Sequence, residues 1–124
     1  MHEKELATVS GLTPEKRYEY FIKKVADYEE VWSLYKDGWV LSQDDFGNTL
    51  FPIWPKEEFA ELCAVNEWSK SEIKAIDLYE FIENLAPSLK KDGIKFDVFS
   101  NNESSILRDI DNLLRDLNEE LENY

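Results

Sequence analysis

The stretch that decides the fold is WVLSQDDFGNTLFPIWPKEEFAELC, residues 39–63. Asp44, Asp45 and Gly47 mark a turn, because aspartate and glycine accept the backbone angles that chain reversals need. A strand is expected over residues 49–54. Pro52 lies within it and cannot donate a ladder hydrogen bond, so the strand is predicted to lie at a sheet edge or to carry a bulge.

The same stretch continues into a helix. Pro55 is expected to open it, since proline is tolerated at the first helical position. Phe59, Leu62 and Cys63 fall on one face, and Cys63 is interpreted as a small buried apolar residue. Residues 39–63 are therefore interpreted mainly as the junction between a sheet and a helix.

Before this junction, residues 1–12 are expected to form a flexible tail. Thr13 and Pro14 predict the start of a helix over residues 14–28, as N-cap and first helical residue. An apolar stripe recurs at spacings of three and four, which is typical of an amphipathic helix. Its members are Tyr18, Phe21, Ile22 and Val25.

A hairpin is expected next. Residues 31–35 are rich in β-forming side chains, and Asp37-Gly38 is a two-residue turn signal. Residues 39–41 would begin the returning strand. Together with the strand at residues 49–54, these segments predict an antiparallel meander.

The second half alternates between strands and helices. A short strand is expected at residues 73–76, then a helix capped by Asp77 that Pro87 should break or kink. Residues 94–98 alternate apolar and polar side chains, which indicates a strand. Asn102 could cap a last helix whose apolar residues recur at 3.6-residue spacing. These are Ile106, Leu107, Ile110, Leu113, Leu114, Leu117 and Leu121.

The order of these elements predicts an α+β fold. Its sheet would be mixed and have about five strands, because strands joined through helices tend to pair in parallel whereas the meander is antiparallel. Four helices would flank the sheet. With 124 residues, the chain is expected to form one domain over residues 13–124.

Composition restricts the partners. The formal net charge is −13, so the surface repels phosphate backbones and anionic lipid. Neither nucleic acid nor a membrane is expected as a partner, whereas a basic protein is. Seven acids and two arginines fall in residues 101–124, a pattern interpreted first as a solvated face and alternatively as a docking face.

The compartment is expected to be the cytoplasm. Cys63 is the one cysteine, so no internal disulfide can form. The N-terminus carries charges and has no long apolar run, and no stretch has the roughly 18 apolar residues that a membrane span needs. Monomer and homodimer both stay open.

No catalytic residue, metal site or cofactor is predicted. The single histidine, His2, lies in the expected tail, so a nucleophile lacks a base and zinc lacks ligands. The segment DDFGN offers oxygens to calcium but lacks the spacing of an EF-hand loop, and a solvated turn is favoured there. Adjacent Asp44 and Asp45 give no reason for two carboxylates to converge on a substrate.

Three segments resemble the bacterial family known as domain of unknown function 2750. They are RYEYFIKKVADYEEVWSL, GWVLSQDDFGNTLFPIWPKEEFAELCA and IDLYEFIENLAPSLKKDG, within residues 17–99. The most specific parts are Gly38-Trp39, the acidic turn at 44–47, the Pro-x-Trp-Pro step at 52–55 and the helix at 59–64. The resemblance implies a small bacterial cytoplasmic protein and brings no catalytic residue. The general plan is also similar to small α+β immunity and secretion-associated domains, a likeness of architecture that does not confer function.

The favoured function is a non-enzymatic protein–protein interaction domain of immunity or regulatory type. Four tryptophans, Trp32, Trp39, Trp54 and Trp68, either pack between sheet and helices or line an exposed groove. Aromatic anchors beside acids suit a basic partner. The expected partner-binding residues are Trp39, Asp44, Asp45, Trp54 and Pro55. The alternative function is small-molecule binding in a pocket between the meander and the helix starting at Pro55; an enzyme that uses carboxylates is the third hypothesis.

Overall fold

Helices and strands alternate along the chain as the α+β prediction requires. The computed structural model describes residues 2–124. The helices are α1 (Glu3–Ser10), α2 (Pro14–Tyr28), α3 (Glu57–Cys63), α4 (Leu78–Glu80), α5 (Ala86–Lys91) and α6 (Ile110–Leu121). The strands are β1 (Glu30–Tyr35), β2 (Ser42–Gln43), β3 (Thr49–Ile53), β4 (Glu72–Asp77), β5 (Lys95–Val98) and β6 (Ile106–Arg108). A 3-10 turn lies at Asn66–Trp68, and a π-helical segment at Phe81–Leu85 joins α4 to α5.

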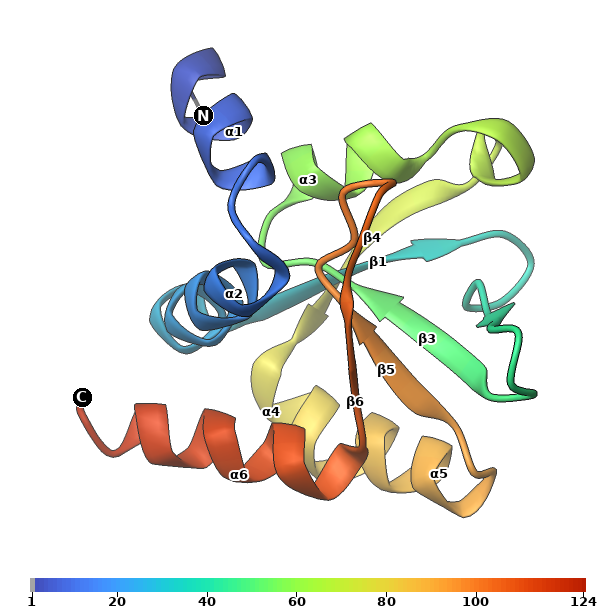
Figure 1. The fold of residues 1–124 in the computed structure, drawn as a ribbon. Helices are drawn as coiled ribbons and strands as arrows, with labels where there is room; N and C mark the ends of the chain where they lie inside the picture. Colours follow the sequence, from blue (N-terminus) through green and yellow to red (C-terminus); the bar gives the residue numbers. More distant parts are fainter. Residues whose placement is uncertain (1) are drawn as a thin grey trace.

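The strands form a mixed arrangement, as predicted (Figure 1). The larger sheet has the order β2-β3-β5-β6, in which β3 and β5 are parallel and the other neighbours antiparallel. Strands β1 and β4 form a separate antiparallel pair. Trp32 and Trp54 connect the two sheets through reciprocal backbone hydrogen bonds of 2.8 and 2.9 Å.

The expected three-stranded meander is wrong in its first pairing. The Asp37-Gly38 turn does reverse the chain, since the Val40 amide donates to the Leu34 carbonyl at 2.9 Å. Beyond that point the returning segment leaves β1, which pairs along its whole length with β4. A turn signal predicts a local reversal, whereas the burial of β1 in the core decides which distant strand becomes its partner. The second pairing of the meander, β2 with β3, is present.

Both alternatives predicted for β3 are wrong: it is an inner strand, and its register with β5 runs from Leu50 to Ile53 without a bulge. Pro52 is accommodated because β2 pairs with β3 only at Thr49 and Leu50 and does not reach Pro52. The Ser33 hydroxyl instead donates to the Pro52 carbonyl at 2.5 Å. The missing N–H of proline therefore faces a gap in the ladder.

Three helix boundaries or breaks differ from the sequence expectation. Helix α3 begins at Glu57, two residues after Pro55, and Leu62 is exposed while Phe59 and Cys63 are buried. Pro87 does not end its helix. The predicted break is therefore wrong. The predicted kink stays a prediction, and a π-helical segment, which is a common cause of helix kinks, lies just before Pro87.

The last helix begins later than expected, because Ile106 and Leu107 belong to strand β6. Asp109 rather than Asn102 caps it, accepting from the Asn112 amide at 2.8 Å. A pattern of apolar residues cannot separate the end of a short strand from the first turn of a helix.

Where the sequence predicted a flexible tail, the structure has helix α1. The His2 side chain accepts from the Lys4 amide at its start, and Val9 is buried. Helix α2 matches its predicted bounds, with the Thr13 hydroxyl accepting from the Lys16 amide.

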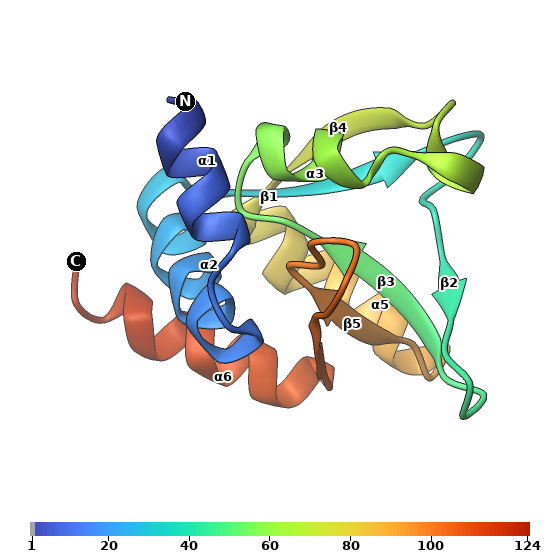
Figure 2. The same ribbon diagram turned by 45° about the horizontal axis from the view of Figure 1, so that its top comes forward.

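The core lies between the sheets and the helices (Figures 1 and 2). Helices α4, α5 and α6 share one side of β3 and β5, where the fully buried rings of Phe51, Phe81 and Phe96 meet at centroid distances of 5.1 and 5.8 Å. Helix α3 packs toward β1 and β4. Helix α2 lies beside α6, and this pairing creates the groove described below.

Candidate functional site

The five partner-binding residues predicted from the sequence do not form one exposed surface. Trp54 is fully buried and its indole N–H donates to the Ser100 carbonyl at 3.0 Å, while Pro55 is also buried. Trp39 is half-buried between Tyr35 and Phe51. These three residues serve packing, as the first interpretation of the tryptophans expected.

Asp44 and Asp45 lie in the turn between β2 and β3, at the opposite end of β3 from Trp54. Asp44 holds the turn together: one carboxylate oxygen accepts from the amides of Phe46 and Asn48, both at 2.9 Å. Hydrogen bonds from Asn48 lower the pKa of Asp44 below its ordinary value. Asp45 is exposed. The structure thus brings the two acids together and separates them from Trp54 and Pro55.

The remaining tryptophans follow the packing interpretation in part. Trp32 and Trp68 are half-buried, and Trp68 meets Trp54 edge to face with ring centroids 6.4 Å apart.

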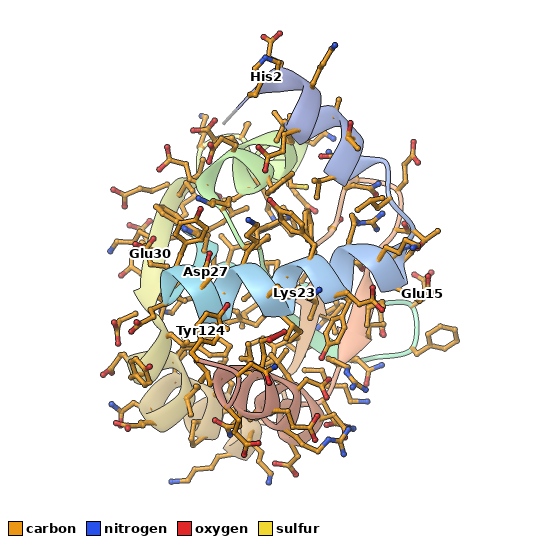
Figure 3. All side chains as sticks on the ribbon, turned by 90° about the vertical axis from the view of Figure 1, so that its left-hand side faces the viewer. His2, Glu15, Lys23, Asp27, Glu30 and Tyr124 are labelled. Carbon is orange, nitrogen blue, oxygen red and sulfur yellow. The ribbon has the colours of Figure 1, made fainter. Side chains whose placement is uncertain are left out.

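A groove of about 400 Å³ runs between α2 and α6. Figure 3 looks onto this face, with α2 above α6. Ile22 is buried and Tyr18 half-buried, and these two side chains form an apolar floor. The other lining residues are polar or charged: Glu19, Lys23, Asp116, Glu119, Glu120 and Asn123. An apolar floor beneath acids from both helices is the geometry that accepts an apolar side chain carried on a basic segment.

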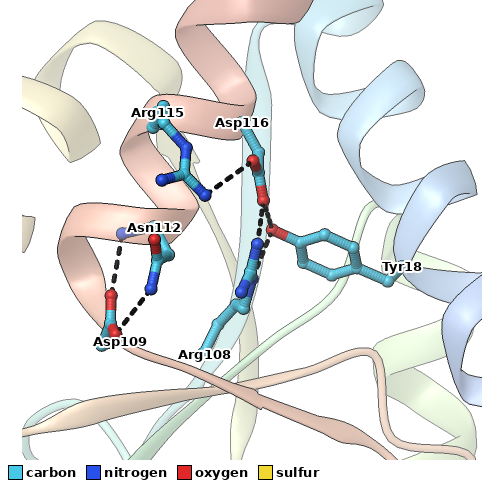
Figure 4. Close-up of polar contacts among 6 residues, drawn as sticks. All are labelled: Tyr18, Arg108, Asp109, Asn112, Arg115 and Asp116. Atoms are coloured by element: carbon cyan, nitrogen blue, oxygen red, sulfur yellow. Dashed lines mark hydrogen bonds and ion pairs between the residues drawn. The ribbon is translucent and has the colours of Figure 1, made fainter.

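The floor of the groove is fixed by a network that joins α2, β6 and α6 (Figure 4). The Tyr18 hydroxyl donates to Asp116 Oδ2 at 2.5 Å. Arg108 donates to both partners, from Nε to the Tyr18 oxygen at 3.1 Å and from Nη2 to Asp116 Oδ2 at 2.6 Å. Arg115 lies 3.8 Å from the other Asp116 oxygen. The network therefore ties α2 to β6 and α6, two neighbouring elements that are far from α2 in the sequence.

This network also fixes protonation states. Burial, then the hydrogen bond with Asp116, raises the pKa of Tyr18 to about 12. Burial acts to raise the pKa of Asp116, but hydrogen bonds from Tyr18 and Arg108 outweigh it and bring that pKa below its ordinary value. At neutral pH the phenol keeps its proton and the carboxylate stays ionised, so the pair supports the groove as a fixed donor and acceptor.

Sequence reasoning missed this groove although it identified both helices. The sequence places Tyr18 and Ile22 on the apolar stripe of an amphipathic helix, and the acids of residues 101–124 are interpreted first as a solvated face and alternatively as a docking face. The usable signal was the spacing of Asp116, Glu119 and Glu120, which places three carboxylates on one side of α6. Which helix would lie opposite that side depends on tertiary packing and is not encoded locally.

A second cavity, of about 250 Å³, lies where the sequence predicted a small-molecule pocket. It is lined by Tyr28, Glu30, Trp32, Pro55, Lys56, Glu57 and Glu58. The Lys56 ammonium lies 3.6 Å from the centroid of the Tyr28 ring, a cation–π contact. The cavity is smaller than the roughly 300 to 1,000 Å³ that is usual for ligand pockets.

Among residues 2–124, no three His, Cys, Asp or Glu side chains are grouped in a way that could hold a metal ion. Cys63 is buried, its thiol donates to the Ser100 carbonyl at 3.2 Å, and burial raises its pKa. In the same described part of the chain, each helix is too short or too polar to span a bilayer.

Comparisons with curated proteins and with solved structures found no match. A family model does match: residues 18–117 fit the model described as a protein of unknown function (DUF2750). This match includes α2 from Tyr18 onward, the sheets, and α6 up to Leu117. Of the residues that line the groove, Glu119, Glu120 and Asn123 lie beyond it. The chain therefore belongs to the DUF2750 family.

Proposed function

We propose that this protein is a non-enzymatic interaction domain that binds a basic segment of a partner protein in the groove between α2 and α6. The observation that carries the proposal is the pairing of an apolar floor, Tyr18 and Ile22, with a rim of carboxylates from both helices. A binding surface of this kind supplies an anchor pocket and charge selection together.

The occupant follows from charge complementarity. Glu19 on α2 and Glu119 and Glu120 on α6 line the groove, and Lys23 is the one base among the lining residues. A segment with an aliphatic or aromatic side chain between lysines or arginines would place its anchor on the floor and its charges against the rim. The net charge of −13 would also speed the encounter with such a partner at low salt.

The test is a fluorescence-labelled array of 12-residue peptides that vary in charge and in one central apolar residue. The wild type is expected to prefer basic peptides with a large central side chain. The variant Glu19→Lys with Glu119→Lys should lose this binding. The matched control, Glu61→Lys with Glu83→Lys, makes the same charge change at exposed sites outside the groove and should keep most of it. Equal loss in both variants, or no preference for basic peptides, would reject the groove as the site.

The cavity beside Pro55 supports a second candidate function, the binding of a small molecule. Its lining combines the apolar surfaces of Tyr28, Trp32 and Pro55 with one base, Lys56, and three acids, which suits a small planar zwitterion. A metabolite panel read by thermal denaturation would detect such a ligand as a rise in melting temperature that Lys56→Met removes. A flat response across the panel would count against this function.

We further propose that the protein acts in the bacterial cytoplasm. The free, buried thiol of Cys63 is compatible with a reducing compartment.

A further inference from the structure

We propose that Phe46, at the tip of the turn between β2 and β3, is an aromatic anchor that inserts into an apolar pocket with a basic rim on a partner protein. This surface lies outside the α2–α6 groove, and the proposal does not depend on the groove being occupied.

The first argument is exposure. Phe46 is 90% exposed, more than any other large apolar side chain among the described residues. Tyr124 has the next-highest exposure, 70%, and lies beyond the last helix. Phe46, in contrast, lies in a hydrogen-bonded turn between two strands. An aromatic ring that gains nothing from the fold's own core is the kind of side chain that dominates binding when a partner buries it.

The second argument is that the turn does not need a phenylalanine. The Asp44 carboxylate accepts from the Phe46 amide at 2.9 Å, from the Asn48 amide at 2.9 Å and from the Asn48 side chain at 2.7 Å. The Asp44 amide donates back to the Asn48 carbonyl at 3.1 Å, and Gly47 supplies the positive φ of 85°. Backbone and aspartate thus complete the turn, and any residue with a backbone N–H at position 46 would satisfy it.

The same hydrogen bonds give the ring a fixed base. A side chain presented from an ordered turn loses less conformational entropy on binding than one carried by a mobile loop. The turn projects from the start of β3 at the edge of the molecule, so a partner can approach it without meeting the helices (Figure 1). Exposure and rigidity together are what an anchor residue requires.

The neighbouring charges define the partner. Asp44 and Asp45 directly precede the ring, and Lys95 on β5 is the nearby base that acts on Asp44. Two carboxylates beside the anchor favour lysine or arginine around the receiving pocket. They oppose insertion into an anionic membrane, and the net charge of −13 opposes the approach of a second copy of the chain.

The test places a photo-crosslinking benzoylphenylalanine at position 46 in the full-length protein in its native host. The control places the same residue at position 107, because Leu107 is 47% exposed on β6 and lies away from the turn. We expect a protein captured at position 46 and not at 107. Mass spectrometry should map its crosslinked residue to an apolar pocket edged by lysine or arginine.

The affinity of Phe46 variants for the captured partner then tests whether the ring is the binding anchor. For the purified partner, Phe46→Ser should raise Kd at least about tenfold, and Phe46→Leu should retain part of the affinity because it keeps an apolar anchor. The groove variant, Glu19→Lys with Glu119→Lys, should leave this Kd within about twofold, which separates failure of this proposal from failure of the proposed function. The melting temperature should be unchanged in both Phe46 variants.

Four results would overturn the proposal. These are equal capture at positions 46 and 107, a mapped site that is polar or acidic, a Kd for Phe46→Ser within twofold of wild type, and Phe46-dependent binding to phosphatidylserine vesicles or to a second copy of the chain in place of a partner protein.

Discussion

At the scale of single residues, the buried Arg17 side chain and the buried Oδ1 atom of Asp97 have opposite consequences for stability. Arg17 is 1% exposed and has no carboxylate partner in its hydrogen-bond set. Its guanidinium donates to the carbonyls of Leu12, Phe99 and Ser104 at 2.5, 3.1 and 2.7 Å. One side chain thus ties the segment before α2 to the loop that follows β5.

We expect Arg17→Ala to lower the free energy of unfolding by about 3 kcal/mol, because it leaves three carbonyls without their donor. Arg115→Ala is the matched control. Its side chain is 59% exposed and should contribute less than about 0.5 kcal/mol. Urea denaturation measures both variants, and a cost for Arg17→Ala no larger than the control would contradict the role of Arg17 as a tie.

Asp97, in contrast to Arg17, lowers the stability of the fold at neutral pH. Its Oδ1 atom is buried without a hydrogen-bond partner among residues 2–124. Burial raises the pKa of Asp97, and Ser105 opposes this shift only in part. A carboxyl whose folded pKa lies above the unfolded value stabilises the fold at low pH and loses that contribution as pH rises through the folded pKa.

Asp97→Asn should therefore raise the free energy of unfolding at pH 7 by about 1 kcal/mol. The neutral amide avoids the cost of burying an ionised carboxylate oxygen that has no hydrogen-bond donor. Below the ordinary carboxyl pKa the gain should disappear, since the wild-type side chain is then neutral in both states. Urea denaturation at pH 3.5 and pH 7 gives the comparison. A variant less stable than wild type at pH 7 would show that the ionised carboxylate is satisfied.

At the scale of elements, the Tyr18–Arg108–Asp116 network joins α2, β6 and α6. The pKa of the Tyr18 phenol is about 12 in the folded state, against an ordinary value of 10.0. Its contribution to stability is fully present below the unfolded-state pKa and is lost as pH rises through the folded-state pKa. The network should therefore be intact across the physiological range.

We expect Tyr18→Phe to cost about 1 kcal/mol of unfolding free energy, because it removes one donor from a charged hydrogen-bonded network. In an ultraviolet titration, the wild-type minus variant difference should show one phenolate forming near pH 12. A difference transition near pH 10 would mean that the Tyr18 hydroxyl is free in solution.

Local signals in the sequence were sufficient for most elements. Three of these signals act within a few residues, and each matches the structure. They are the Thr13 cap with Pro14, the Asp77 cap and the alternation of apolar and polar residues in β5. The failures concern contacts between distant segments. Nothing near β1 indicates that β4, some forty residues later, will pair with it. Nothing near Pro52 indicates that β2 will be too short to reach it, which is what allows a proline on this inner strand.

The candidate site was predictable to the same limited extent. The acidic turn lies where the sequence predicted it, whereas Trp54 and Pro55 are buried. For Trp54 the reason is the large area of the indole ring, which favours the core. Exposed Phe46 stands between two acids and a glycine, a context that allows a surface aromatic but does not require one. The groove combines α2 with α6 and could not be found from either helix separately.

At the scale of the whole molecule, two surfaces carry part of the acidic excess behind the net charge of −13. Carboxylates of α2 and α6 border the groove, and two more precede Phe46 in the β2–β3 turn. An acidic surface with two anchor sites of different shape, one concave and one projecting, is the physical basis for regarding this domain as a partner for basic proteins.

The measurement that tests the central claim most directly is a titration of ¹⁵N-labelled protein with the best basic peptide from the array, followed by amide chemical shifts. The account predicts saturable changes concentrated on α2 and α6 around Tyr18, Ile22 and Glu119, weakened at 0.5 M salt. Saturable changes confined to another surface, or the same changes with an acidic peptide of equal length, would contradict it.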